Sequence, residues 1–154
     1  MPPRRIGLIS DTHDLLRPAA LDFLAGCDHI VHAGDICGAH VLETLAAIAP
    51  LTVVRGNNDT APWARTLPET ARIDVGTVAL YAIHDLKLLA VDPRAAGVRV
   101  VVSGHSHRPE CCERDGVLYV NPGSAGRRRF SLPISAAELF IDGAAVEARL
   151  VTLA

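Results

Sequence analysis

Aromatic residues are scarce in this chain. They make up 4% of the 154 residues, whereas 49% of the residues are hydrophobic. The core must therefore be built from aliphatic side chains, and the length suits a single domain over residues 1–154. An excess of one charge is also missing: the net charge is −2, and Lys87 is the only lysine among 15 basic residues. This balance excludes the basic surface that an extended nucleic-acid track requires.

Long hydrophobic runs are absent as well. No apolar stretch approaches the roughly 20 residues of a membrane span, and the run 6–9 is too short for a signal peptide. The four cysteines show neither C-x-x-C spacing nor a disulfide framework; they are Cys27, Cys37, Cys111 and Cys112. We therefore expect a cytoplasmic protein with reduced thiols and no membrane partner.

Short apolar runs alternate with helical patterns in the first third of the chain. Strands are predicted over 5–10, 28–33 and 51–55, with helices near 18–25 and from Val41 to Ile48. This order favours parallel strands joined by crossover helices. The later segments are predicted to form hairpins over 71–83, 108–121 and 134–153, a buried strand over 98–102, and short helical segments over 86–91 and 93–96.

Polar side chains that can bind metal ions follow directly after the predicted strands. In α/β sheets, ligands bind outside the carboxyl ends of the strands. Nitrogen and oxygen ligands without thiolate fit Mn, Fe, Zn, Ni or Co better than Ca or Mg. Two such ions about 3.5–4 Å apart can clamp a phosphoryl group and hold a hydroxide. The candidate ligands are Asp11, His13, Asp35, Asn57, His84, His105 and His107.

Several polar residues also have simple structural interpretations. Asp14 could cap the following helix, and Asp85 is first interpreted as a cap for 86–91, with a contact to His84 as the alternative. His32 is interpreted as a hydrogen-bonded core histidine. The run Arg127–Arg129 predicts a solvated basic loop, and the alternative is a phosphate contact by one arginine.

The ordered motifs resemble the calcineurin-like metallophosphoesterase superfamily, and in particular its small YfcE-type phosphodiesterase branch. The resemblance implies an α/β fold: a four-layer αββα sandwich of two mixed β-sheets flanked by helices. It covers nearly the whole chain. The motifs are Asp11-x-His13, Gly34-Asp35, Gly56-Asn57-Asn58-Asp59, His84, Gly104-His105-Ser106-His107 and Asn121-Pro122-Gly123-Ser124.

The resemblance also assigns roles to these residues. Asp11, His13 and His107 would bind one divalent ion; Asn57, His84 and His105 would bind the other, with Asp35 between them. Asp59 would support these ligands from behind, and Asn58 and Arg127 would face the substrate. The expected cofactor is a pair of divalent ions, Mn in first place, with Fe, Ni, Zn or Co as alternatives.

The implied activity is hydrolysis of a small phosphodiester by a metal-bridging hydroxide. The alternative is a non-catalytic protein-interaction scaffold of the same fold, and a homo-oligomer is left open. Two positions depart from the family pattern. Asn58 replaces a histidine that many members use as an acid, and His84-Asp85-Leu86 replaces a His-Gly-His. No catalytic side chain is therefore assigned.

Overall fold

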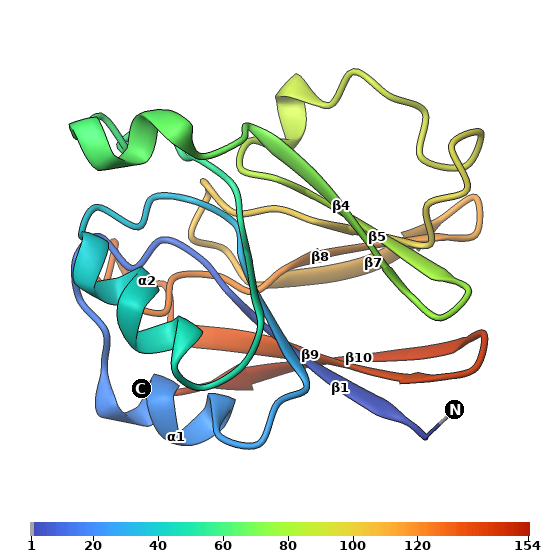
Figure 1. Ribbon diagram of the computed structural model, residues 1–154, viewed down its shortest axis with the longest axis horizontal. Helices are drawn as coiled ribbons and strands as arrows, with labels where there is room; N and C mark the ends of the chain where they lie inside the picture. Colours follow the sequence, from blue (N-terminus) through green and yellow to red (C-terminus); the bar gives the residue numbers. More distant parts are fainter. Residues whose placement is uncertain (1) are drawn as a thin grey trace.

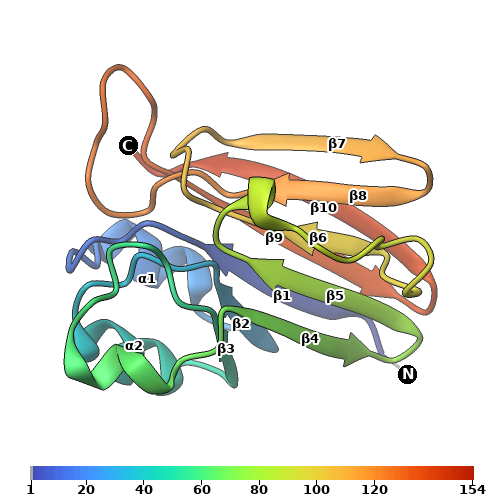
Figure 2. The same ribbon diagram turned by 90° about the horizontal axis from the view of Figure 1, so that it is seen from above.

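Residues 2–154 are described by a computed structural model, in which two mixed sheets stack face to face (Figures 1 and 2). The first sheet has the strand order β10-β9-β1-β2-β3 and the second has the order β4-β5-β6-β8-β7. The strands of the first sheet are β1 (Arg4–Ile9), β2 (His29–His32), β3 (Leu51–Val53), β9 (Ser135–Asp142) and β10 (Ala145–Thr152). Those of the second are β4 (Thr70–Val75), β5 (Val78–Ile83), β6 (Val100–Val102), β7 (Glu110–Arg114) and β8 (Val117–Asn121).

The predicted crossover pattern is confirmed in the first sheet. β1, β2 and β3 are parallel, and they are joined through α1 (Pro18–Leu24) and α2 (Ala39–Ala46). The second sheet repeats this feature, because β6 is parallel to both β5 and β8. Each sheet therefore directs the carboxyl ends of three parallel strands to one edge. The three predicted hairpins are also present, as β4–β5, β7–β8 and β9–β10.

Alternation along β1 separates the two layers of the core. Ile6 and Leu8 are buried between the two sheets, in a cluster of aliphatic side chains that contains no aromatic residue. Ile9 faces the other way and packs with Leu24 of α1 and Leu45 of α2. A side chain at Gly7 would collide with Leu24, so glycine allows α1 to lie close against β1.

The first turns around α1 differ from the prediction. Asp14 does not cap α1, which begins at Pro18 with Arg17 as an N-cap that makes no side-chain bond. Proline there removes one of the backbone donors that a cap would serve. Instead, Asp14 Oδ1 lies 2.6 Å from His40 Nε2 on the first turn of α2. Asp14 therefore joins its loop to the start of α2 rather than capping α1.

The outer faces of the two sheets are covered differently. Both α-helices of the described residues pack on the first sheet, whereas the second is bordered by the segment 84–99. The helix predicted over 86–91 is only a 3₁₀ turn, Leu86–Leu88, and 93–96 forms a turn without a helix. The turn stops at Leu89, which has extended geometry (φ −61°, ψ 114°). The α/β class with two mixed sheets is confirmed, with a loop as the outermost layer on one side.

No helix among residues 2–154 is long and apolar enough to cross a bilayer.

Candidate metal centre

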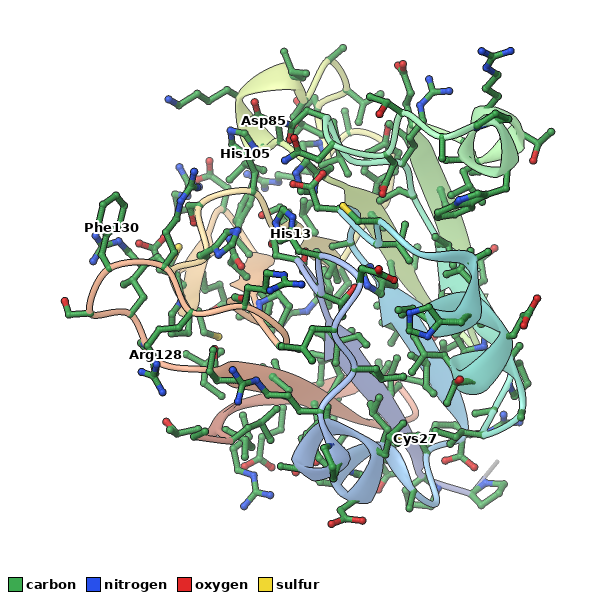
Figure 3. The ribbon with its side chains drawn as sticks, turned by 90° about the vertical axis from the view of Figure 1, so that its left-hand side faces the viewer. His13, Cys27, Asp85, His105, Arg128 and Phe130 are labelled. Carbon is green, nitrogen blue, oxygen red and sulfur yellow. The ribbon has the colours of Figure 1, made fainter. Side chains whose placement is uncertain are left out.

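The candidate ligands follow the carboxyl ends of the parallel strands, and Figure 3 shows two of them, His13 and His105, on the same side of the molecule. Backbone hydrogen bonds join the loops there: Asp11 N donates to Gly34 O and His13 N to Asp35 O, each at 3.0 Å. Gly104 N donates to His84 O at 2.9 Å, which joins the loops of the second sheet. The strand ends thus bring together residues that are far apart in the sequence.

Five candidate ligands have a left-handed backbone, a conformation that costs about 1–3 kcal/mol for a residue with a side chain. Nine non-glycine residues in 2–154 have positive φ, so the candidate ligands account for more than half of them. Such strain persists only where surrounding contacts impose it, and it gathers at functional sites. The five are Asp11 (54°), His13 (45°), Asp35 (58°), His105 (72°) and His107 (62°).

One group of ligand atoms surrounds Asp11. The Nε2 atoms of His13 and His107 lie 3.3 Å apart, and Asp11 Oδ1 lies 3.9 Å and 3.5 Å from them. Two nitrogens each about 2.1 Å from one ion, at an angle near tetrahedral, have a similar separation. Asp11 Oδ1 is buried and has no hydrogen-bond partner among residues 2–154. A bound cation would supply the missing partner, so this group fits a divalent ion.

Asp35 lies between that group and a second one. Its Oδ2 atom is 3.6 Å from His13 Nε2 and 3.4 Å from His84 Nε2. Asp11 Oδ1 is also 4.0 Å from His84 Nε2. The ligand atoms of Asp11, Asp35 and His84 all lie within 4.8 Å of one another. Both carboxylates therefore lie where two neighbouring ions would share their charge.

Asn57 and His105 extend the second group towards solvent. Asn57 Oδ1 is 3.0 Å from His84 Nε2 and 3.1 Å from His105 Nδ1. The other nitrogen of each ring has its own contact. His84 Nδ1 lies 2.7 Å from the carbonyl oxygen of Ala33, and His105 Nε2 lies 3.9 Å from Asp85 Oδ2. Such contacts orient imidazoles towards metals in many proteins.

Asp59 holds the two acidic loops together. Its Oδ2 accepts hydrogen bonds from Asp35 N (2.9 Å) and Gly56 N (2.8 Å), and its Oδ1 accepts one from Cys37 N (2.9 Å). Asp59 is 5% exposed, so these bonds account for a carboxylate that is nearly removed from water. It supports the placement of Asp35 without facing the ligand cluster.

Burial shifts the pKa values of the candidate ligands in the group around Asp11. Burial raises the pKa of Asp11 to about 6. Burial, together with the charge of His13, lowers the pKa of His107 to about 4, and burial also lowers the pKa of His13. Both rings are therefore neutral at pH 7, as metal binding requires.

His84 and Asp35 shift in opposite directions. Burial opposes charge on His84, but the hydrogen bond to Asp35 and the charge of Asp11 outweigh it and raise its pKa overall. Burial also opposes charge on Asp35, but hydrogen bonds from His84 and Asn58 hold its pKa well below the usual range.

His32 is a hydrogen-bonded core histidine, as predicted. Its Nδ1 accepts a bond from Gly34 N (3.1 Å), and its Nε2 lies 3.0 Å from the hydroxyl of Thr12. That hydroxyl donates to Ile36 O, so Nε2 must carry the proton. Burial lowers the pKa of His32 to about 3, and the ring stays neutral beneath the site.

A cleft of about 250 Å³ opens over the ligand groups. Asn58 lines it and donates from Nδ2 to Asp35 Oδ2 at 3.0 Å. Arg127 also lines it; its Nε donates to His13 O at 3.0 Å, and its terminal nitrogens have no hydrogen-bond partner among residues 2–154. Arg128 and Arg129 complete the rim, whereas Phe130 is 88% exposed and points away from the site (Figure 3).

A model of the calcineurin-like phosphoesterase superfamily domain matches residues 5–143. The chain belongs to this superfamily. A probable metallophosphoesterase of Methanothermobacter thermautotrophicus is 31% identical to it over 157 aligned residues, which cover 95% of this chain and 91% of the relative. The family model and this relative indicate phosphoester hydrolysis with bound metal, and two groups of residues in the cluster could hold a metal ion.

Solved structures confirm the fold. An archaeal phosphodiesterase is 21% identical to this chain, with a TM-score of 0.78 over 96% of this chain and 99% of the other. Vps29 from Chaetomium thermophilum is 22% identical, with a TM-score of 0.80 over 97% of each chain. A predicted phosphoesterase from Streptococcus pneumoniae is 20% identical, with a TM-score of 0.76 over 99% of this chain and 91% of the other.

Some supporting contacts were not predicted. Asp85 caps the turn as predicted, by accepting from Lys87 N (3.1 Å), but its other oxygen faces His105 and not His84, which was the alternative. Asn121 holds the histidine loop, because its Nδ2 donates to Gly104 O (2.9 Å) and Ser106 Oγ (3.1 Å). The sequence signal for Asn121 was its tight turn; the contact partners depend on the packing of the second sheet.

Proposed function

We propose that this protein is a dinuclear metal-dependent phosphodiesterase of small substrates. The observation that carries the proposal is the placement of Asp35 Oδ2, which lies within 3.6 Å of the nearest nitrogens of both His13 and His84. One carboxylate oxygen between two sets of imidazoles suits a shared ligand of two cations. We propose Asp11, His13 and His107 as ligands of one ion, Asn57, His84 and His105 as ligands of the other, and Mn as the first metal to test.

Divalent ions held by these residues would neutralise charge on phosphoryl oxygens and would make a bound water more acidic. The side chains set up that chemistry. Asp35 and Asp11 supply the negative charge, and Ala33 O keeps the Nε2 atom of His84 turned towards the cluster. Arg127 is anchored on His13 O, where its free nitrogens can orient a substrate phosphate.

Departure of the leaving group has no dedicated acid in this proposal. Asn58 occupies the position of the usual histidine, and its amide already donates to Asp35. General acid catalysis typically contributes about 10²–10⁴-fold, so bond cleavage depends here on the leaving group's own pKa. We expect nitrophenyl diesters to be cleaved far faster than alkyl diesters. Similar rates for both, in a chemistry-limited assay, would contradict this assignment.

A non-catalytic scaffold is the alternative function. It rests on the likeness to Vps29, one structure of which is a complex with a cyclic peptide. That likeness is below 25% identity and concerns the fold. One Vps29 structure is also a complex with zinc, so turnover rather than metal binding alone separates the two functions.

The deciding experiment is metal analysis combined with hydrolysis of bis-p-nitrophenyl phosphate. We expect about two ions per chain after loading with Mn, and turnover that disappears with chelation and returns with Mn. His84→Ala should abolish turnover, while His29→Ala, which changes a histidine outside the site, should preserve it. A protein that binds fewer than one ion per chain and lacks turnover would favour the scaffold.

A further inference from the structure

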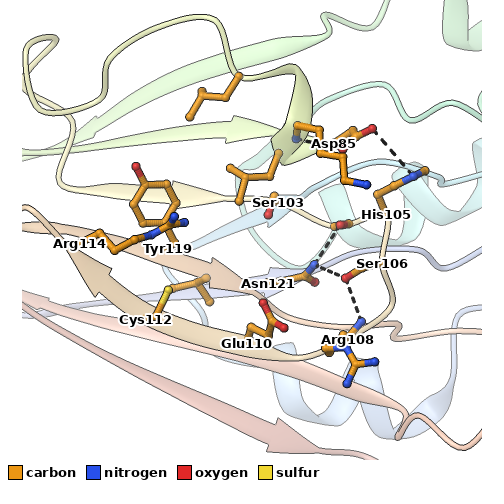
Figure 4. A pocket seen from close by; sticks show the side chains of 15 residues that line it. Asp85, Ser103, His105, Ser106, Arg108, Glu110, Cys112, Arg114, Tyr119 and Asn121 are labelled. Carbon is orange, nitrogen blue, oxygen red and sulfur yellow. Dashed lines mark hydrogen bonds and ion pairs between the residues drawn. The ribbon is translucent and has the colours of Figure 1, made fainter.

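A second cavity, of about 570 Å³, lies on the outer face of the second sheet beside the metal centre (Figure 4). Its floor is formed by residues of β7 and β8 and by the loop that follows β6, and one wall is the segment 85–89. Because no α-helix of residues 2–154 packs there, the face stays open from Tyr119 to His105. We call this cavity the outer groove. Its polar floor includes Ser103 and Asn121, which are buried.

The far end of the outer groove carries a flat cationic surface. The guanidinium carbon of Arg114 lies over the ring of Tyr119, 4.3 Å from its centroid. The two residues come from adjacent strands, where Arg114 pairs with Val117 and Tyr119 with Cys112. A stacked arginine exposes a planar face, and such faces stack on nucleobases. Glu110 on the same face of β7 offers carboxylate oxygens to the amino group of a base.

The outer groove is also lined by cationic side chains that form no ion pair. Lys87, Arg108 and Arg114 all line the outer groove, and none of them forms an ion pair within residues 2–154. Asp85, in contrast, faces His105 and caps its own turn. Glu110 is the lining acid without an ion-pair partner among residues 2–154, so three unpaired cations face one unpaired acid and the groove favours an anion.

The outer groove and the metal cleft share His105, which lines both. The shared wall is fixed in place by Asn121, through its bonds to Gly104 O and Ser106 Oγ (Figure 4). The cleft and the outer groove therefore adjoin at His105, so the ester arm of a phosphodiester bound over the ligand groups would enter the groove there. A nitrophenyl or alkyl arm would leave Arg114 and Tyr119 without contact.

We propose that the outer groove binds the nucleoside arm of a nucleotide phosphodiester, with the base stacked on Arg114. This inference rests on the proposed phosphodiesterase function and names its substrate class. A volume of about 570 Å³ lies within the 300–1,000 Å³ typical of small-molecule sites. A base can stack on the planar guanidinium of Arg114, and a phosphate can pair with the unpaired cations. A neutral alkyl arm can do neither.

The first test measures binding without catalysis. Isothermal titration of the metal-stripped protein compares 5′-AMP with ribose 5-phosphate, which has the same phosphate and sugar but no base. We expect AMP to bind at least about fivefold tighter, the lower range of base stacking on a protein side chain. Arg114→Gln should remove that preference, whereas Arg94→Gln, an exposed arginine outside the groove, should preserve it. Equal affinities for the two ligands, or a preference that survives Arg114→Gln, would overturn the proposal.

A blocking variant covers the case in which Arg114→Gln fails to fold. Cys112 is exposed on β7 and lines the groove, and a strand accepts aromatic residues, so Cys112→Phe should fold while filling the space. It should abolish the preference for AMP. Retention of the preference in folded Cys112→Phe would place the base elsewhere and overturn the proposal.

The second test separates this inference from the proposed function. With the Mn-loaded enzyme, Arg114→Gln should lower kcat/KM for a linear dinucleotide at least about fivefold more than for bis-p-nitrophenyl phosphate. Equal losses for both substrates would count against the groove. A protein that hydrolyses neither substrate but keeps its Arg114-dependent AMP preference would refute the phosphodiesterase function while leaving a nucleotide site.

Discussion

The two halves of the candidate metal centre are built on opposite principles. In the Asp11 half, a buried carboxylate faces two imidazoles, and the Nδ1 atom of His107 has no hydrogen-bond partner within residues 2–154. In the Asn57 half, a neutral amide replaces the carboxylate, but both rings are oriented from behind, by Ala33 O and Asp85. One half supplies charge and the other supplies orientation. Asp35 belongs to both, so the halves should differ in how they lose metal.

The largest effect should come from removing the shared ligand. Asp35→Asn should reduce the bound metal in both halves, because an amide carries no charge to offer two cations. Changes that only disturb a ligand's orientation cost 10–100-fold, so we expect activity to fall at least about 100-fold. Metal analysis after gel filtration, together with the nitrophenyl assay, measures both quantities.

His13→Ala is the matched comparison for that variant. It should remove the ion of one half and leave most of the other, so its metal content should exceed that of Asp35→Asn. Equal metal loss in the two variants would show that Asp35 is no bridge.

A change at Asp85 should disturb the orientation of the His105 ring in the Asn57 half. Asp85→Asn should weaken metal binding by about tenfold, the lower end of the range for groups that orient a histidine ligand, because its distance to His105 is 3.9 Å. Asp92→Asn is the control, since Asp92 also accepts backbone bonds in a turn but lies outside the site. Chelator competition measures the affinities. An Asp85→Asn protein that matches Asp92→Asn would assign Asp85 to the turn alone.

The two halves should lose metal affinity at different pH, because protons compete with metal ions for the histidine nitrogens. The pKa of His84 is raised, so as the pH falls a proton occupies this ring, and competes with a metal ion, before one occupies His13 or His107. The pKa of His107 is about 4 and that of His13 is lowered, so their rings take up a proton only under more acid conditions. Between pH 8 and 6.5 the Asn57 half should therefore lose affinity first. Calorimetric titration at the two pH values should show one class of sites weakening; parallel weakening of both classes would contradict this order.

The smallest effect should follow from Cys37→Ser. Cys37 Sγ lies 3.6 Å from His13 Nδ1, so it is the counterpart in the first half of Asp85 in the second. Burial and nearby acids raise the pKa of its thiol to about 12, which keeps it neutral and a weak partner. We expect changes in metal affinity and turnover below about twofold, the range of uncritical substitutions. A loss as large as that of Asp85→Asn would mean that both halves depend on orientation.

The sequence predicted more of the centre than of its surroundings. The residues after each strand could be named because parallel strands end at one edge, and the crossover pattern followed from the spacing of Val41 and Leu45. The length of the turn after Asp85 could not be predicted, because Leu86 and Leu89 pack on the second sheet with Tyr119 instead of continuing a helix. The contact of Asp85 with His105 depends on that turn. Local propensity gives no information about such pairings, since they arise when two distant loops meet.

The left-handed backbone at five candidate ligands gives metal a role in folding. Without ions, the chain must hold these residues in unfavourable conformations while two acids face each other in a nearly dry site. An ion that binds the folded form alone shifts the unfolding equilibrium, by about 2.7 kcal/mol when its concentration is 100 times its dissociation constant. The concentration of available metal would then regulate how long the chain survives proteolysis, in addition to whether it is active. The melting temperature should accordingly rise with each ion bound, so the stability of this protein should follow the concentration of available metal.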